Sequence, residues 1–183
     1  NNHGDADYWV VKSNASGNLE WQKSLGGSGL DRANDITQAD DGGFVVIGHT
    51  SSNNGDVEVH YFGFDIWAVK MNALGEIEWQ KTLGGSDQDW GEAIQKTIDG
   101  GYIIAGSTWS TDGDVHDDDS TFDMWVIKLS DEGVLQWQKT LGGTKGEDAF
   151  SISQTSDQGY IVSGTAFSND GDVSGLHAKS DCW

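Results

Sequence analysis

The chain has 183 residues, enough for one domain with its own core, and it carries 10 basic against 30 acidic residues, a formal net charge of −20. Nucleic acids and anionic membrane surfaces are therefore excluded as expected partners, because both bind basic surfaces. The sequence has no apolar run of about 18 residues that could insert into a membrane, and its single cysteine excludes an internal disulfide. The 26 glycines, the nine tryptophans and the absence of proline indicate short strands and many turns.

A repeat of 58 residues runs through the chain without insertion or deletion. It is clearest in two series of tryptophans with this spacing: Trp9, Trp67, Trp125 and Trp183, and Trp21, Trp79 and Trp137. Three repeats cover residues 9–66, 67–124 and 125–182, and residues 175–183 correspond to residues 1–9. A period of this length is typical of architectures in which one supersecondary unit is stacked on the next.

Four segments of each repeat have the pattern of strands. In the middle of the chain they are Ala93–Thr97, Tyr102–Gly106, Met124–Lys128 and Leu135–Leu141. The turn at Asp99-Gly100-Gly101 joins the first two as a hairpin, because such turns need positive φ. The second and third segments are almost continuously apolar and are expected to be buried on both faces, whereas the fourth alternates and leaves one face in water.

Four strands per repeat predict an all-β fold, namely a β-propeller built of 58-residue blades, with residues 1–183 as one repeat domain. The blades are predicted at about residues 31–83 and 89–141, with a third split between residues 147–183 and 1–25. The chain would then have an open half-blade at each end. Because three blades are too few to close a ring, we expect either a place in a longer propeller or head-to-tail pairing between chains, as a closed six-bladed dimer or a filament.

The residues that define the repeat form a distinctive pattern. In the middle of the chain they are Asp65, Trp67, Lys70, Gly75, Trp79-Gln80-Lys81, Leu83-Gly84-Gly85, Asp99-Gly100-Gly101, Gly106, Ser110, Gly113, Asp114 and Val115. This pattern resembles repeats of large secreted and surface proteins of Bacteroidetes and other prokaryotes, and is similar to the bacterial β-propeller repeats abbreviated SBBP. The resemblance implies a propeller that is secreted or at the cell surface, and implies little about activity. The third repeat departs from the pattern, because Gln158 replaces the first turn glycine.

The loop between the second and third strands carries oxygen-bearing residues at alternate positions. It reads Ser-x-x-Gly-Asp-Val from Ser52, Ser110 and Ser168. Such alternation points several oxygens into one concavity, as calcium loops do, and divalent ions would relieve the repulsion of a chain with charge −20. The candidate metal ligands are Asn54, Asp56, Asp112, Asp114, Asp170 and Asp172. The alternative is a β-turn in which these side chains accept backbone N–H groups.

Two further groups of residues are candidates for specific roles. An aspartate precedes the third strand in every copy, as Asp7, Asp65, Asp123 and Asp181. We expect these to be structural, as buried carboxylates that accept hydrogen bonds, with ion ligation as the alternative. The repeated tryptophans are expected in the core. Trp90 and Trp109 lie outside the repeat columns near strand ends and are the candidate binding residues, since aromatic faces stack on sugars.

The sequence thus predicts a non-enzymatic, extracellular structural or adhesion module that calcium stabilises and that assembles with copies of itself. No nucleophile elbow, His-Glu-x-x-His motif or phosphate-binding loop supports catalysis. A lectin-like propeller that binds surface glycans is one alternative. An accessory domain of a large secreted enzyme is another.

Overall fold

The computed structural model describes residues 3–58, 63–116, 121–175 and 181–182. The described residues form 13 strands, and none of them forms a helix that could cross a membrane. The strands are β1 (Tyr8–Ser13), β2 (Leu19–Leu25), β3 (Asp31–Gln38), β4 (Phe44–Thr50), β5 (Asp65–Met71), β6 (Ile77–Leu83), β7 (Asp89–Lys96), β8 (Tyr102–Thr108), β9 (Asp123–Leu129), β10 (Leu135–Leu141), β11 (Glu147–Gln154), β12 (Tyr160–Ala166) and β13 (Asp181–Cys182). The predicted all-β fold is confirmed.

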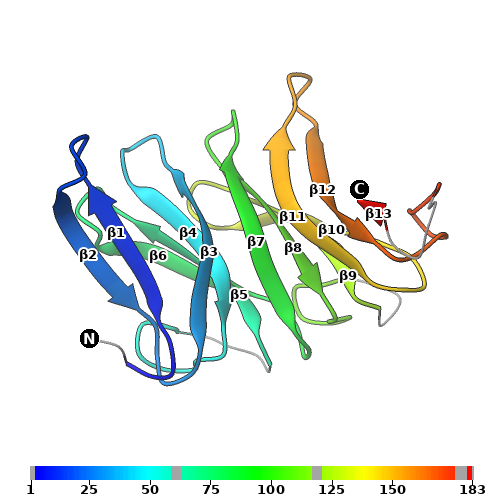
Figure 1. Cartoon of the computed structure of the whole chain (residues 1–183), viewed down its shortest axis with the longest axis horizontal. Coiled ribbons are helices and arrows are strands. Elements are labelled where there is room, and N and C mark those ends of the chain that lie inside the picture. The colour runs from blue at the N-terminus through cyan, green and yellow to red at the C-terminus, as the bar shows by residue number, and fades with distance from the viewer. Residues whose placement is uncertain (1–2, 59–62, 117–120, 176–180, 183) are drawn as a thin grey trace.

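The strands form four antiparallel sheets that stand in a row (Figure 1). Two sheets have four strands each, β3 to β6 and β7 to β10, and strands consecutive in sequence are hydrogen-bonded neighbours. A two-stranded sheet, β1 and β2, stands at one end of the row, and a three-stranded sheet, β11 to β13, at the other. Over the described residues the row does not close into a ring (Figure 1).

The strand predictions hold best where the hydrophobic pattern is regular. The predicted segment Leu135–Leu141 is β10. The predicted segment Ala93–Thr97 is wrong at its start, because β7 begins at Asp89. A register shift between Gly91 and Ala93 inserts an extra residue into the pairing of β7 with β8. This bulge breaks the alternation of side chains, so the sequence pattern hides the first half of the strand.

A left-handed residue closes the hairpin between the first two strands of each of the three larger sheets. Gly42 and Gly100 have φ of 84° and 89°, and Gln158 has φ of 72° at the corresponding position. A side chain in this conformation costs roughly 1–2 kcal/mol. The third repeat therefore forms the same turn as the other two, but with Gln158 in a backbone conformation that is unfavourable for a residue with a side chain.

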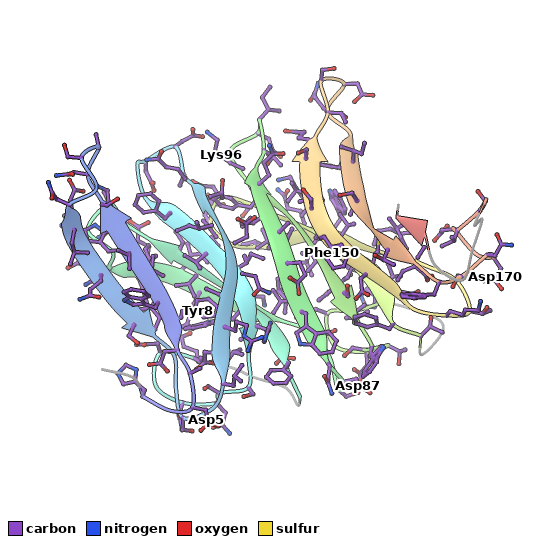
Figure 2. The ribbon with its side chains drawn as sticks, viewed as in Figure 1. Asp5, Tyr8, Asp87, Lys96, Phe150 and Asp170 are labelled. Carbon is purple, nitrogen blue, oxygen red and sulfur yellow. The ribbon has the colours of Figure 1, made fainter. Side chains whose placement is uncertain are left out.

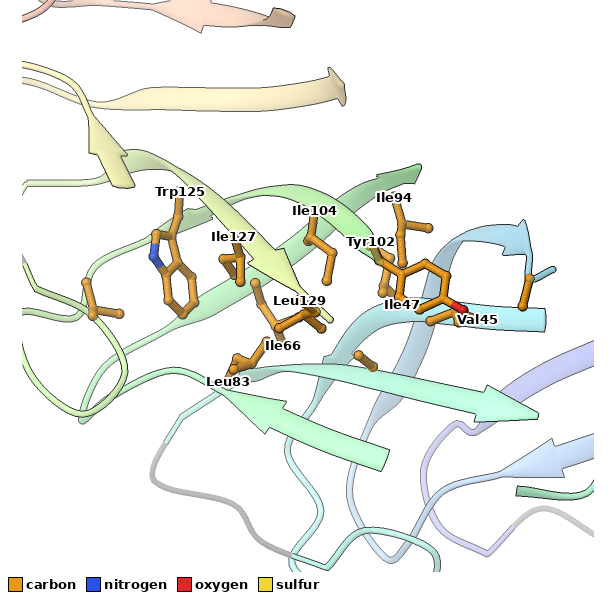
Figure 3. Packing of buried hydrophobic residues seen from close by; sticks show 13 residues of the cluster. Val45, Ile47, Ile66, Leu83, Ile94, Tyr102, Ile104, Trp125, Ile127 and Leu129 are labelled. Carbon is orange, nitrogen blue, oxygen red and sulfur yellow. The ribbon is translucent and has the colours of Figure 1, made fainter. Parts of the chain in front are cut away.

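The core lies between neighbouring sheets. Successive side chains of a strand point to opposite faces, so in β4 Val45 packs toward the sheet β7 to β10, while Val46 packs toward β1 and β2. Figure 3 shows the first of these layers, where Ile66 and Leu83 of one sheet meet Trp125 of the next. Each central sheet is covered on both faces, which explains why its inner strands read as continuous apolar runs.

The first tryptophan series is buried only in the middle of the row. Trp67 and Trp125 have no exposed surface, whereas Trp9 of β1 is 69% exposed. Trp183, the last member of this series, lies outside the described residues. In the second series Trp137 is 40% exposed. The expectation that repeated tryptophans are core residues is thus right for Trp67 and Trp125 and wrong for Trp9 and Trp137. The face of Trp9 is open because no sheet of the described chain covers it.

Candidate functional site

The Ser-x-x-Gly-Asp-Val loops clasp the Gly-Gly segment that connects one sheet to the next. The third residue of each loop accepts a backbone N–H through Oδ1: Asn54 from Ser28 at 2.8 Å, Asp112 from Ser86 at 2.7 Å and Asp170 from Thr144 at 2.9 Å. The aspartate of each loop donates its N–H to the first glycine: Asp56 to Gly26 at 2.9 Å, Asp114 to Gly84 at 2.9 Å and Asp172 to Gly142 at 2.8 Å. The side chains thus accept backbone N–H groups, as in the alternative to calcium, but these groups belong to the Gly-Gly segment and not to the turn itself. The contacts fix how each sheet follows the one before it.

Calcium binding by these loops stays a prediction. Several candidate oxygens already serve the backbone, including Asp56 Oδ2, which accepts the Gly26 N–H at 3.1 Å. Over the described ranges, no three His, Cys, Asp or Glu side chains are grouped as a metal centre. Asp114 Oδ2 is different, because it is buried and has no hydrogen-bond partner within the described structure. It is an oxygen that a cation could satisfy.

The aspartates that precede the third strands are buried. Asp65 is fully buried, Asp123 is 4% exposed and the Asp7 side chain is 2% exposed. Ser24 Oγ donates to Asp7 Oδ2 at 2.9 Å, and Thr121 Oγ1 donates to Asp123 Oδ1 at 2.9 Å. Asp181 lies in β13, and its side chain is outside the described structure. Asp7 and Asp123 are thus buried carboxylates that accept hydrogen bonds, as expected for a structural role.

A second column of buried acids, not anticipated from the sequence, consists of Asp31, Asp89 and Glu147. Asp89 Oδ2 accepts the Gly85 N–H and the Ser110 hydroxyl, each at 2.9 Å. It also lies 2.4 Å from the point where a Gly84 side chain would begin, and Asp65 Oδ1 lies 2.5 Å from the same point. Burial first, and then the Asp65 charge, raise the pKa of Asp89 to about 6.

The two ends of the row expose surfaces that are covered elsewhere. Ile161 of β12 is 61% exposed, whereas its counterparts Val45 and Ile103 are fully buried. The strand edges are open as well: β13 pairs with β12 at Thr165 and Ala166, while β4 pairs with β5 along all seven residues of each strand. Each end is therefore an incomplete version of the sheets in the middle, with an apolar face and an unpaired edge in its described part.

A cleft of about 540 Å³ lies along the first strands of the three larger sheets, β3, β7 and β11. It sits at the end of these strands where Asp87 is labelled in Figure 2, and the exposed Phe150 of β11 lies along it. Its wall is a cluster of Trp90, Trp109 and Phe122, whose rings meet edge to face with centroids 5.3–5.9 Å apart. The two tryptophans proposed as binding residues are thus brought together, in a cleft of the size that binds small molecules.

Charged side chains of both signs share this aromatic cleft. Arg32, Glu92 and Asp148 come from β3, β7 and β11. Burial and then the Asp148 charge raise the pKa of Glu92, and burial and then the Glu147 charge raise the pKa of Asp148. Both carboxylates are thus partly shielded from water, where hydrogen bonds to them are strong.

His49 of β4 also lines the aromatic cleft. It is 7% exposed, and its Nδ1 is buried without a hydrogen-bond partner in the described structure. Burial, reinforced by the Arg32 charge, lowers the pKa of His49 to about 4, so the ring is neutral at pH 7. A buried polar atom without a partner costs free energy that a bound ligand can recover.

The aromatic cleft is lined by residues at which the repeats differ. Residues 58 apart occupy the same position of successive repeats, here called a column. Three columns near the cleft hold a different residue in each repeat: Arg32, Trp90 and Asp148; Asn34, Glu92 and Phe150; and His49, Ser107 and Thr165. Scaffold columns such as the Gly-Gly pair are identical in all three repeats. Sequence reasoning singled out Trp90 and Trp109 but missed the charged residues and His49. The sequence marks these residues only by the difference between repeats at their positions. That difference indicates a site only when the structure shows that the positions lie together.

Comparison with protein-family models and with curated proteins found no match to this chain. The class defined by the described residues is an all-β protein of stacked antiparallel sheets. What it does is therefore argued from the open ends of the row and from the aromatic cleft.

Proposed function

We propose that the protein is a non-enzymatic, extracellular structural or adhesion module whose sheets are blades of a β-propeller that assembles head to tail with copies of itself. A row of repeated four-stranded antiparallel sheets, packed face to face, supports the propeller. The resemblance of the repeat to those of secreted and surface proteins supports the extracellular setting.

The exposure of Trp9 carries this proposal. Trp67, its counterpart, is buried against the sheet that precedes it, with its ring 4.7 Å from that of Tyr8. Trp9 nevertheless holds the same orientation, because its Nε1 donates to Gln22 at 3.0 Å just as Trp67 Nε1 donates to Gln80 at 2.9 Å. Burying a large apolar side chain is worth roughly 2–3 kcal/mol. A preceding sheet is the partner that this face fits.

A second copy of the chain can supply that sheet. If β1 of one copy pairs with β12 of another in the register of β5 with β4, Trp9 stands opposite Gly164, as Trp67 stands opposite Gly48. The composite sheet has four strands, β11 and β12 from one copy and β1 and β2 from the other, with β1 in place of β13. In this arrangement Trp9 is covered by the sheet β7 to β10 of the copy that supplies β11 and β12. Ile161 is covered by the sheet β3 to β6 of the copy that supplies β1 and β2. A single contact between two copies therefore covers both open faces.

Trp9→Ala tests the assembly. The substitution removes a side chain that is 69% exposed in the single chain, so the fold is expected to persist while assembly is lost. We expect light scattering on a sizing column to give a mass of two or more chains for the wild type and of one chain for Trp9→Ala. A mass of two chains indicates a closed ring, and larger masses indicate an open filament.

The matched control is Leu74→Ala. Leu74 is 68% exposed in the turn between β5 and β6, away from both open faces, and its loss is expected to leave the mass unchanged. A wild type that stays a single chain at high concentration contradicts the proposal, as does a Trp9→Ala variant that assembles like the wild type.

Calcium is the proposed stabiliser of the clasping loops, through the buried Asp114 Oδ2. Extracellular calcium modules bind with Kd on the order of 10⁻⁴–10⁻³ M. We expect the Tm in millimolar calcium to exceed the Tm in chelator by about 2–4 °C, and Asp114→Asn to reduce the difference. Asp87→Asn, outside the loops, is the control. Equal Tm values of the wild type in both buffers would leave the loops as turns only.

A further inference from the structure

All the side chains that line the aromatic cleft belong to one chain. We propose that the cleft binds a neutral oligosaccharide, through stacking on the Trp90–Trp109–Phe122 cluster and hydrogen bonds in which sugar hydroxyls donate to the carboxylates and accept from the guanidinium around it. This goes beyond the structural role proposed above, because it gives the module a ligand of its own.

The aromatic cluster fits the apolar face of a sugar ring. Its three rings are packed against one another, with no centroid pair farther apart than 5.9 Å, so a ligand cannot enter between them and must lie on their outer surface. Trp109 offers that surface, because it is 41% exposed. The C–H groups on the face of a pyranose ring carry slight positive charge and are attracted to the electron-rich face of an indole.

The charges in the aromatic cleft have both signs. Glu92 and Asp148 repel anions, and the chain as a whole has a net charge of −20. Arg32, which lies among them, offsets part of their attraction for cations. A ligand whose groups both donate and accept hydrogen bonds satisfies both signs at once, and sugar hydroxyls do this. We therefore take a neutral glycan as the ligand, and tighter binding of a cation is the outcome that would overturn this choice.

His49 places an unsatisfied polar group beside the aromatic cleft. Its Nδ1 is buried and has no partner in the described structure, and the residue lines the aromatic cleft. A neutral imidazole carries one donor and one acceptor, so a small rotation of the ring would let it pair with a hydroxyl group. Phe64, which meets the His49 ring edge to face at 5.3 Å, holds that ring in place.

The divergence of the repeats sets the stoichiometry. Arg32, Trp90 and Asp148 share one column, so the residues that surround the cleft differ from one repeat to the next. The other junctions of the row cannot reproduce the same set of side chains. We therefore expect one site per chain, in contrast to a lectin with equivalent sites between all blades.

Titration of the full chain with soluble oligosaccharides tests the proposal. The probes are the hexamers of β-1,4-glucose, β-1,4-N-acetylglucosamine and β-1,4-mannose, with polygalacturonate as the anionic probe and tetramethylammonium as the cationic probe. Tryptophan fluorescence and calorimetry provide the readouts. We expect saturable binding of at least one neutral hexamer at one site per chain, with a shift in tryptophan emission, and weaker or no binding of the two charged probes.

Trp109→Ala and Trp137→Ala form a matched pair of variants. Both remove a tryptophan of nearly equal exposure, 41% and 40%, but Trp137 lies in β10, outside the aromatic cleft. We expect Trp109→Ala to weaken binding at least ten-fold and Trp137→Ala to leave it unchanged. The proposal is overturned if no neutral hexamer binds, if a charged probe binds more tightly than all of them, or if the two variants bind equally well. None of these outcomes bears on the mass measurement that tests assembly.

Discussion

Asp65 and Asp89 place two buried carboxylates beside Gly84, where the chain passes from one sheet to the next. The pKa of Asp89, about 6, lies above the value near 3.9 of an unfolded chain, so the folded state binds this proton more tightly. Its contribution to the free energy of unfolding is therefore complete below about pH 4 and is lost as the pH rises through 6. His49 acts in the opposite direction, because its pKa is lowered to about 4 and its contribution is lost as the pH falls.

Asp89→Asn separates the two contributions. The amide cannot ionise, so the variant avoids the loss that the wild type suffers as the pH rises. We expect the free energy of unfolding of Asp89→Asn, relative to that of the wild type, to increase by about 1 kcal/mol between pH 5 and pH 7.5. Urea unfolding at a series of pH values measures this, with His49 unchanged in both proteins. A difference that stays constant across the series would show that Asp89 does not titrate in this range.

The bounds of β10 could be predicted from the sequence, and the start of β7 could not. β10 has the predicted bounds, because Leu135, Trp137 and Leu141 mark the alternation. The first half of β7 could not be predicted, because the bulge near Glu92 shifts the side chains by one position. The bulge also places Trp90 O against the backbone of β8, where Gly106 stands. Gly106 belongs to the repeat pattern, but only the structure identifies the group that approaches it.

Gly106→Ala tests this close approach. A Cβ added at Gly106 would lie 2.0 Å from Trp90 O, a backbone atom fixed by the pairing of β7 with β8. We expect a loss of about 3 kcal/mol in the free energy of unfolding, measured by urea denaturation. Gly146→Ala is the control, since the nearest atom to its added Cβ is 3.6 Å away and a change within about 0.5 kcal/mol is expected. Equal losses in both variants would mean that β7 can shift to make room.

At the scale of the whole molecule, the 58-residue period predicts repeated sheets and incomplete ends. Each repeat carries the same strand pattern, whether or not a neighbouring sheet is present to cover it. The aromatic cleft is outside the reach of such reasoning. Arg32, Trp90 and Asp148 are far apart in sequence and share only a column number, and the row of sheets brings their strands together. When a ligand site consists of residues that differ between repeats, the sequence shows only that these positions are not conserved from one repeat to the next, and does not show that they form a site.

The arrangement of the sheets in a row also means that the molecule is nearly one-dimensional. Its core consists of three layers, each between two neighbouring sheets, so the free energy that resists opening is a sum of local terms. The sheets β1–β2 and β11–β13 each have one such neighbour within the described chain and are expected to fray first, with faster exchange of their amide hydrogens than in β5 or β8. Joining the ends of two chains would protect both frayed sheets in a single event, so that assembly and resistance to proteolysis would rise together with protein concentration.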